Sequence, residues 1–299
     1  MSNELSNNRK EDNSKPIAWV RKSNKNPSTY LTGNNNVPYL RYYRLDEIPF
    51  INHGFSTRLG GVSKAYLSSM NLSFTRGDEE ENVITNYHRI SAAIGFDEEN
   101  LVAGDQTHTT NVRRVTAEDR GKGIWRSRDY TDVDGLITNE QNLVLVTYFA
   151  DCVPLYLVDI KNKAIGLSHS GWKGTLHKMG AVTLKKMKQE FQTNPADVVV
   201  CIGPSICQDC YEVSSEVALA FCENMDEKEQ KQILQPKPEG KYQLNLWEAN
   251  RLVFLHAGVL EQNIVMPDLC TCCNPELLYS HRASKGQRGN LAAFLTIKS

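Results

Sequence analysis

The sequence predicts an α/β fold in one compact domain that follows a short polar tail. Short apolar runs typical of strands alternate along the chain with longer stretches whose apolar residues recur at helical intervals. The 299 residues, 40% of them hydrophobic, contain no internal repeat and no convincing linker. Residues 1–15 are polar and poor in aromatic residues, so we assign them to a disordered tail and residues 16–299 to the domain.

The N-terminal half begins with strands and reaches its first helix at Asp78. Residues 16–50 alternate apolar and polar side chains around a turn at 34–36. Residues 78–94 show a helical stripe, and Asp78 with Glu81 has the spacing of a capping box. Short apolar runs predict further strands, and the run 143–149 is apolar throughout, which predicts a strand covered on both faces.

In the C-terminal half the apolar pattern changes to a helical period after Trp172. Residues 176–191 predict a helix, and 198–202 a buried strand that Gly203-Pro204 ends. Further helices are predicted near 213–221 and 246–258, and the last strand at 291–297.

The stretch 147–174 is the centre of the predicted chemistry. Its apolar runs 153–158 and 164–167 flank a polar turn, which predicts a β-hairpin. Folded about that turn, paired residue numbers sum to about 321, so Cys152 lies opposite His169. Opposed residues have Cβ atoms about 5 Å apart, close enough for the thiol and imidazole to share a metal ion or a proton. The alternative is a buried cysteine and a hydrogen-bonded core histidine.

His108 adds a second histidine at the end of a predicted strand. With Cys152 and His169 it forms a His₂Cys set, and three protein ligands that leave one position open are typical of catalytic zinc. A blue-copper site would need the same three ligands and an axial methionine. Without a metal, Cys152 and His169 would be a nucleophile and its base.

Other polar residues near these segments are candidate ligand-binding or catalytic groups. Arg58 lies beside Gly60-Gly61, where its planar guanidinium could hold phosphate or carboxylate, although a surface arginine is the alternative. We include Asn71 and Gln106 as candidate substrate-binding residues. Asp151 and Asp105 are candidate acids or bases.

Five of the eight cysteines form a second group. Cys207-x-x-Cys210 and Cys270-x-Cys272-Cys273 have ligand-like spacing and could bind a structural zinc if they meet in space. Because a C-x-x-C spacing alone is weak evidence, we expect buried thiols and no second metal.

Charge and composition limit the classes of partner. With 34 basic and 35 acidic residues the formal charge is −1, which does not favour nucleic acid or an anionic membrane surface. No apolar run reaches the roughly 18 residues of a membrane span, and residues 1–15 lack the apolar core of a secretory signal. We expect a cytoplasmic protein with reduced thiols; a monomer is compatible with the sequence, which does not fix the oligomeric state.

Six motifs together resemble those of the YfiH/YlmD family, once called laccase-domain or polyphenol oxidase proteins. The resemblance covers His53 to Lys298 and rests on FSTRLGGVS, DQTH, FADCVPLYL, SHSGWKG, IGPSICQDCYEV and CNPELLYSHR. It implies a single α/β domain with a mixed sheet, similar to the Cys-His toxins of the cytotoxic necrotizing factor group. It also implies that His108, Cys152 and His169 are metal ligands.

The resemblance further implies phosphorolysis of purine nucleosides to a free base and ribose 1-phosphate. The substrates would be adenosine, inosine, guanosine and methylthioadenosine, with phosphate as co-substrate, zinc rather than copper as cofactor, and adenosine deamination as a side activity. Rival functions are a Cys-His hydrolase or amidase acting on cell-wall peptides, a copper-dependent polyphenol oxidase, and a non-enzymatic binding factor. This chain lacks the family's second arginine after Ser280-His281-Arg282, and Arg288 is the expected replacement.

Overall fold

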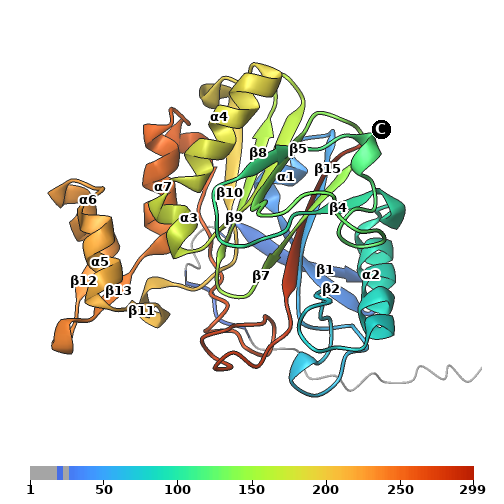
Figure 1. The fold of residues 1–299 in the computed structure, drawn as a ribbon, viewed down its shortest axis with the longest axis horizontal. Coiled ribbons are helices and arrows are strands. Elements are labelled where there is room, and N and C mark those ends of the chain that lie inside the picture. The colour runs from blue at the N-terminus through green and yellow to red at the C-terminus, as the bar shows by residue number, and fades with distance from the viewer. Residues whose placement is uncertain (1–18, 23–26) are drawn as a thin grey trace, which may run out of the picture.

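Two six-stranded sheets form the centre of the computed structural model, which describes residues 19–22 and 27–299 (Figure 1). The first sheet is antiparallel except where β4 lies parallel to β7. In spatial order its strands are β1 (Thr29–Asn34), β2 (Val37–Tyr42), β3 (Ile51–Ser56), β15 (Leu291–Ile297), β7 (Val144–Phe149) and β4 (Leu101–Ala103). The tail predicted for residues 1–15 lies outside the described residues.

The second sheet is antiparallel at its centre and parallel at both edges. In spatial order its strands are β14 (Ile264–Val265), β10 (Val198–Ile202), β8 (Val153–Asp159), β9 (Ala164–Ser170), β6 (Gly135–Thr138) and β5 (Val112–Arg114). The predicted α/β fold with mixed β-structure is confirmed, although these strands divide between two sheets and do not form one.

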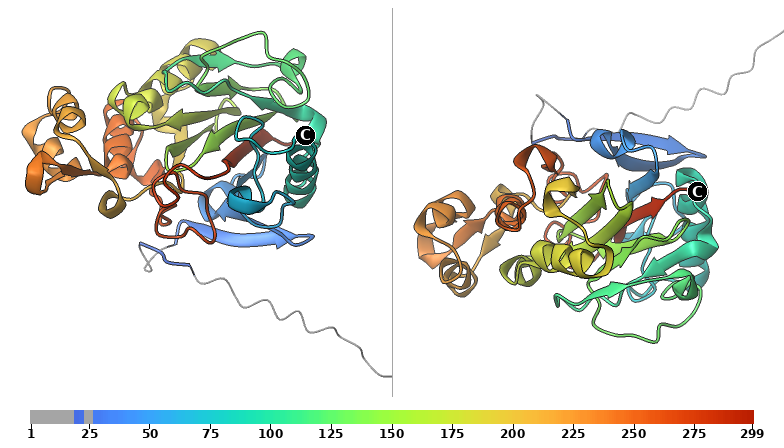
Figure 2. Two further views of the ribbon diagram at one scale, coloured as in Figure 1. Left: turned by 60° about the horizontal axis from the view of Figure 1, so that its bottom comes forward. Right: turned by 90° about the horizontal axis from the view of Figure 1, so that it is seen from above.

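The two sheets pack face to face, and helices cover their outer faces. The cluster between the sheets includes Phe55 and Leu145 of the first sheet with Tyr156 and Leu167 of the second. On the outer faces lie α2 (Glu80–Ile94), against the first sheet, and α4 (Met179–Phe191) with α7 (Leu246–His256), against the second. Figures 1 and 2 show this order of layers, with α2 and α4 on opposite sides of the strands.

A small antiparallel sheet with two helices extends beyond α7 (Figure 2). It consists of β11 (Glu212–Val213), β13 (Tyr242–Leu244), β12 (Leu234–Pro236), α5 (Ser215–Cys222) and α6 (Glu227–Ile233). The remaining short helices are α1 (Tyr43–Asp46), α3 (Trp172–Leu176), η1 (Ala65–Leu67), η2 (Glu98–Asn100), η3 (Ala117–Asp119), η4 (Pro195–Asp197), η5 (Gln208–Cys210), η6 (Pro238–Gly240) and η7 (Glu261–Asn263).

Strand β7 confirms the prediction of a strand covered on both faces. Leu145 faces the layer between the sheets, whereas Val144 and Val146 pack on the α2 side. Since successive side chains of a strand point to opposite faces, an apolar run follows when both faces are covered. Within the part of the chain that the structure describes, no helix is both long and apolar enough to cross a bilayer.

Two helix predictions need correction. The capping box at Asp78 is absent, because α2 begins at Glu80 and Asp78 instead accepts hydrogen bonds from Ser63 Oγ (2.6 Å) and Asn71 Nδ2 (2.8 Å). The helix predicted to begin at residue 176 is divided into α3 and α4 by Lys178, whose φ of 59° interrupts the helical path.

Candidate active site

The β8–β9 hairpin positions two of the three predicted ligands. His169 pairs with Pro154, so paired numbers sum to 323, and the predicted pairing of Cys152 with His169 is wrong by two residues. A slip by two keeps side chains on the same face, whereas a slip by one would reverse them. Cys152 directly precedes β8, and its Sγ therefore still reaches the ring of His169.

His108 joins this pair from the loop between β4 and β5. One ligand atom from each of His108, Cys152 and His169 lies within 4.8 Å of the other two. The two imidazole rings meet edge to face, with centroids 4.9 Å apart. His108 is exposed and has a φ of 67°, a left-handed conformation that costs energy for a residue with a Cβ atom.

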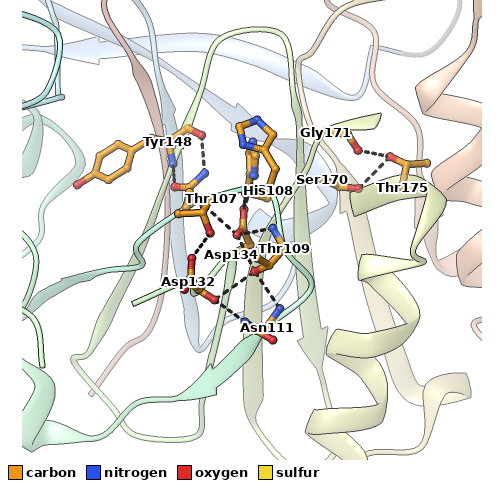
Figure 3. A network of polar contacts seen from close by, with 12 residues as sticks. Thr107, His108, Thr109, Asn111, Asp132, Asp134, Tyr148, Ser170, Gly171 and Thr175 are labelled. Carbon is orange, nitrogen blue, oxygen red and sulfur yellow. Dashed lines mark hydrogen bonds and ion pairs between the residues drawn. The ribbon is translucent and has the colours of Figure 1, made fainter. Parts of the chain in front are cut away.

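Asp134 holds this arrangement in place, and the sequence analysis missed it. Its carboxylate accepts hydrogen bonds from the backbone N–H groups of Thr107, His108 and Thr109 at 2.9–3.1 Å (Figure 3). Its Oδ1 also lies 2.8 Å from Nδ1 of His169, which leaves the Nε2 atom of that ring free to bind a metal. A carboxylate behind a ligating histidine is a recurrent feature of metal sites.

The sequence signal for Asp134 was its position just before a strand. Gly135 pairs with Ser168 in the antiparallel β6–β9 ladder, so Asp134 falls opposite His169. The N–H group of His169 donates to the Asp134 carbonyl at 2.8 Å, one residue beyond the named ladder. Only the pairing of β6 with β9, which the sequence did not reveal, brings the two side chains together.

The electrostatics of the pair favour a charged sulfur. Burial by itself would raise the pKa of the Cys152 thiol. The neighbouring rings of His169 and His108 stabilise the thiolate more strongly and lower that pKa to about 6. Burial likewise works against a charged His169, while Cys152 and Asp134 raise its pKa to about 9. At neutral pH the metal-free site therefore holds a Cys152 thiolate beside a protonated His169, and a metal ion binding Nε2 of His169 would displace that proton.

A cavity of about 230 Å³ opens against these three side chains. Its other walls include Phe74, Asp105, Tyr148 and three arginines, Arg76, Arg128 and Arg288. A wider hollow adjoins it and shares Phe74, Asp105 and Arg128. Because sites for drug-sized ligands span roughly 300–1,000 Å³, the cavity and hollow together suit one small polar substrate.

Arg288 lines the cavity with a positively charged side chain, and one of its N–H groups lacks a hydrogen-bond partner in the part of the chain that the structure describes. Burial, with the charge of Arg76, lowers the pKa of its guanidinium to about 10, so it stays protonated at neutral pH. Its Nη1 donates to the carbonyl of Gly289 at 3.3 Å, but its buried Nε has no hydrogen-bond partner among the described residues. An unpaired buried donor is costly, and the positive charge of Arg288 lines the cavity, where it can attract an anion.

Arg58 and Asn71 do not line the cavity, so the structure does not bring them to the three candidate ligands. The Arg58 guanidinium donates to the Ser68 carbonyl at 2.8 and 3.0 Å and to that of Pro275 at 2.7 Å, and its charge lies over the ring of Tyr279. Asn71 is fully buried, and its Nδ2 donates to Asp78. Both side chains hold neighbouring loops together.

Gln106 and Asp151 position backbone near the site. Gln106 lines the cavity, but its side-chain amide is hydrogen-bonded to the backbone of Tyr148. Its Nε2 donates to the Tyr148 carbonyl at 2.9 Å, and its Oε1 accepts from the Tyr148 N–H at 2.6 Å. Asp151 accepts hydrogen bonds from Thr271 Oγ1 (2.6 Å) and from the N–H of Arg282 (2.7 Å), and does not line the cavity. Asp151 therefore joins the segment before β8 to two loops outside the cavity, and its role as acid or base stays a prediction.

The donor set fits a catalytic zinc site. One thiolate and two imidazoles, one of them hydrogen-bonded to a carboxylate, match the ligand types of such a site with one position left open. A blue-copper site would add an axial methionine, but in the described ranges no methionine lines the cavity.

Comparison with known proteins points to the same family as the six sequence motifs. The sequence model described as multi-copper polyphenol oxidoreductase laccase matches residues 52–298. A relative in Bacillus subtilis named purine nucleoside phosphorylase YlmD is 35% identical over 254 residues, which cover 82% of this chain and 88% of that protein. A purine nucleoside phosphorylase of Bacteroides thetaiotaomicron is 34% identical over 259 residues, with 86% and 96% covered.

A solved structure confirms the fold. The crystal structure of YlmD from Geobacillus stearothermophilus matches with a TM-score of 0.83 at 31% identity, covering 91% of this chain and all of that one. The family model spans most of the chain, and relatives above 30% identity cover more than two thirds of it. The chain therefore belongs to the YfiH/YlmD family, whose sequence model is described as multi-copper polyphenol oxidoreductase laccase.

Proposed function

We propose that this chain is a purine nucleoside phosphorylase with zinc at His108, Cys152 and His169. One observation carries the proposal: a His₂Cys donor set and the positively charged Arg288 line the same small cavity. The names of the relatives in Bacillus and Bacteroides support the reaction class. A panel of purine nucleosides, incubated with inorganic phosphate and assayed for free base and ribose 1-phosphate, tests it directly.

In the proposed reaction, Arg288 binds phosphate beside the ribose. A phosphate oxygen forms a bond to C1′ as the bond from C1′ to the purine nitrogen breaks. The electron pair of that bond leaves with the base, which takes up a proton. Guanidinium groups suit this task because their planar N–H groups match two phosphate oxygens at once, and Arg76 adds a second positive charge to the same cavity.

Other residues of the cavity would orient the nucleoside. Phe74 offers an aromatic face for the purine, and its ring is held by stacking on Tyr87 with centroids 5.9 Å apart. Asp105 keeps its carboxylate at the cavity by pairing with Arg128 at 3.0 Å, where it can accept hydrogen bonds from ribose or amino groups. Zinc, when bound, would supply a Lewis acid for a substrate oxygen or nitrogen.

We also propose adenosine deamination at the same site as a side activity. Replacement of the 6-amino group by oxygen needs water, a metal and a nearby acid or base. Of the two aspartates named in the sequence analysis, Asp105 lines the cavity whereas Asp151 does not. Asp105 is therefore the group that would exchange protons with the purine.

The geometry also supports a second function, a cysteine hydrolase. Cys152, His169 and Asp134 have the order of nucleophile, base and orienting carboxylate, and Cys152 is a thiolate at neutral pH. The metal content of the purified protein separates the two functions. Stoichiometric zinc released by replacing His108 supports the phosphorylase site, because a free nucleophilic thiolate needs no second histidine.

Replacing Arg288 with glutamine should raise the KM for phosphate. Loss of one charged hydrogen bond costs about 1.5–3 kcal/mol, so we expect a rise of about 10- to 150-fold with a smaller effect on the KM for nucleoside. Lys285→Gln, which removes an exposed charge in the same loop but does not line the cavity, is the matched control. An unchanged KM for phosphate in the Arg288 variant would place the anion elsewhere.

Replacing Asp134 with asparagine should weaken zinc binding by about 10- to 100-fold, the usual effect of losing a partner behind a ligating histidine. Competition with a chromophoric chelator measures the affinity. Asp132→Asn is the control, because Asp132 accepts a hydrogen bond from Thr107 Oγ1 in the same loop. Equal zinc affinities of the two variants would show that Asp134 supports the loop and not the ligand.

A further inference from the structure

Four cysteines from two distant loops meet at one point. Cys207 and Cys210 follow β10, and Cys270 and Cys273 follow β14, the parallel neighbour of β10. All four Sγ atoms lie within 4.8 Å of one another, and the structure contains them as free thiols. The spacing of the cysteines led us to expect no second metal here, and the convergence of four Sγ atoms is the reason to reverse that expectation.

The four residues also form a stricter sequence pattern than the one first considered. They are two C-x-x-C pairs, Cys207 with Cys210 and Cys270 with Cys273, while Cys272 lies outside the group. One C-x-x-C pair is weak evidence for a metal, but two that converge supply the four ligands of a zinc ribbon or knuckle.

We propose that Cys207, Cys210, Cys270 and Cys273 bind a structural zinc ion, separate from the His₂Cys site. Four thiolates at the usual zinc–sulfur distance lie about 3.8 Å apart in a tetrahedron. The Sγ atom of Cys273 is 3.5 Å from that of Cys210 and 4.0 Å from that of Cys207. Since four protein ligands leave no open position, this ion would be structural and not catalytic.

Neighbouring groups match the negative charge of a zinc–tetrathiolate centre. The N–H group of Cys207 donates to Sγ of Cys270 at 3.2 Å. Arg282 donates to the carbonyl of Cys210 at 3.2 Å, so a cation lies against the same loop. Lys22 adds no net charge there, because its Nζ pairs with Asp209 at 2.9 Å.

The zinc would fix the loops that hold the segment before Cys152. The N–H of Ile206, next to Cys207, donates to the carbonyl of Asp151 at 3.0 Å. Thr271, next to Cys270, donates to the Asp151 carboxylate at 2.6 Å. Asp151 itself has a φ of 89°, an unfavourable conformation that these contacts hold. The tetrathiolate site thus stabilises one wall of the active site from outside it.

Metal analysis of purified protein tests the proposal without an activity assay. In zinc-supplemented growth, Cys152→Ala protein should retain one zinc per chain, whereas the same protein with Cys210→Ser and Cys273→Ser added should retain none. Cys222→Ser, a half-buried free thiol outside both groups, is the matched control and should lose no zinc. Cobalt-grown Cys152→Ala protein should show strong thiolate-to-cobalt absorption, because its remaining site is all sulfur.

Two results would overturn the proposal, and neither requires the triple variant to fold. One is Cys152→Ala protein that is folded but carries no zinc after growth and purification with zinc. The other is a mass two hydrogens lower for each disulfide, restored by reduction, which would show that these cysteines are paired with one another. Because both measurements use a variant that lacks the His₂Cys thiolate, they do not depend on the proposed function.

Discussion

Cys152→Ala should lower nucleoside turnover at least about 100-fold and leave the fold intact. Loss of a ligand should exceed the 10- to 100-fold effect of losing a partner behind a ligand. Cys152 lies just before β8 at the cavity and not in the middle of a strand, so the cost in folding free energy should be about 1 kcal/mol. Phosphorolysis rates measure the loss of turnover, and thermal unfolding measures the cost in folding free energy.

The control for this variant is Cys222→Ala, which removes a half-buried thiol far along the chain from the site. It should keep wild-type turnover and zinc. If Cys152→Ala keeps near-normal turnover, the thiolate takes no part in the reaction, and if it unfolds, Cys152 is a structural residue.

Omitting phosphate should abolish release of adenine from adenosine and spare formation of inosine. Phosphate is the nucleophile at C1′ in phosphorolysis, whereas deamination at C6 consumes water. Both reactions would use the cavity lined by His108, Cys152 and His169, so one preparation can be assayed for both. Chromatography of the purine products with and without phosphate separates the two reactions.

Arg288→Gln sharpens this experiment, because it should impair adenine release and largely spare inosine formation. Equal loss of both would mean that Arg288 holds the nucleoside or the loop and not phosphate. Undiminished adenine release in the absence of phosphate would make the enzyme a hydrolase, and the phosphorylase proposal would be wrong.

The β8–β9 hairpin shows what the local apolar pattern could predict and what it could not. Apolar runs around a polar turn identified β8 and β9 and placed Cys152 and His169 on one face, although the register was two residues off. The pattern has a period of two, so it specifies the face strongly but fixes the register only together with the turn. Because an error of two residues leaves the face unchanged, Cys152 and His169 still meet, and their role as metal ligands stays a prediction.

The sequence predicted less well the positions of residues whose contacts are with segments far away in the chain. Arg58 looked like an anion-binding residue from the neighbouring glycines, but its guanidinium contacts carbonyl groups as far away as Pro275. Arg288 proved to line the cavity, a position that depends on how its loop packs against the rest of the chain. The contact of Asp134 with His169 depends on the pairing of β6 with β9, which the sequence pattern did not predict.

The sequence by itself determined the α/β class, the strands and helices with clear periodicity, the family, and the three residues His108, Cys152 and His169. These depend on local patterns and short motifs within one or two elements. The tertiary structure alone decided that the strands form two facing sheets, that Asp134 lies behind His169, and that Cys207 meets Cys270 across 63 positions of sequence. Such contacts depend on strand order and sheet packing, which join segments whose separation in sequence carries no periodic signal.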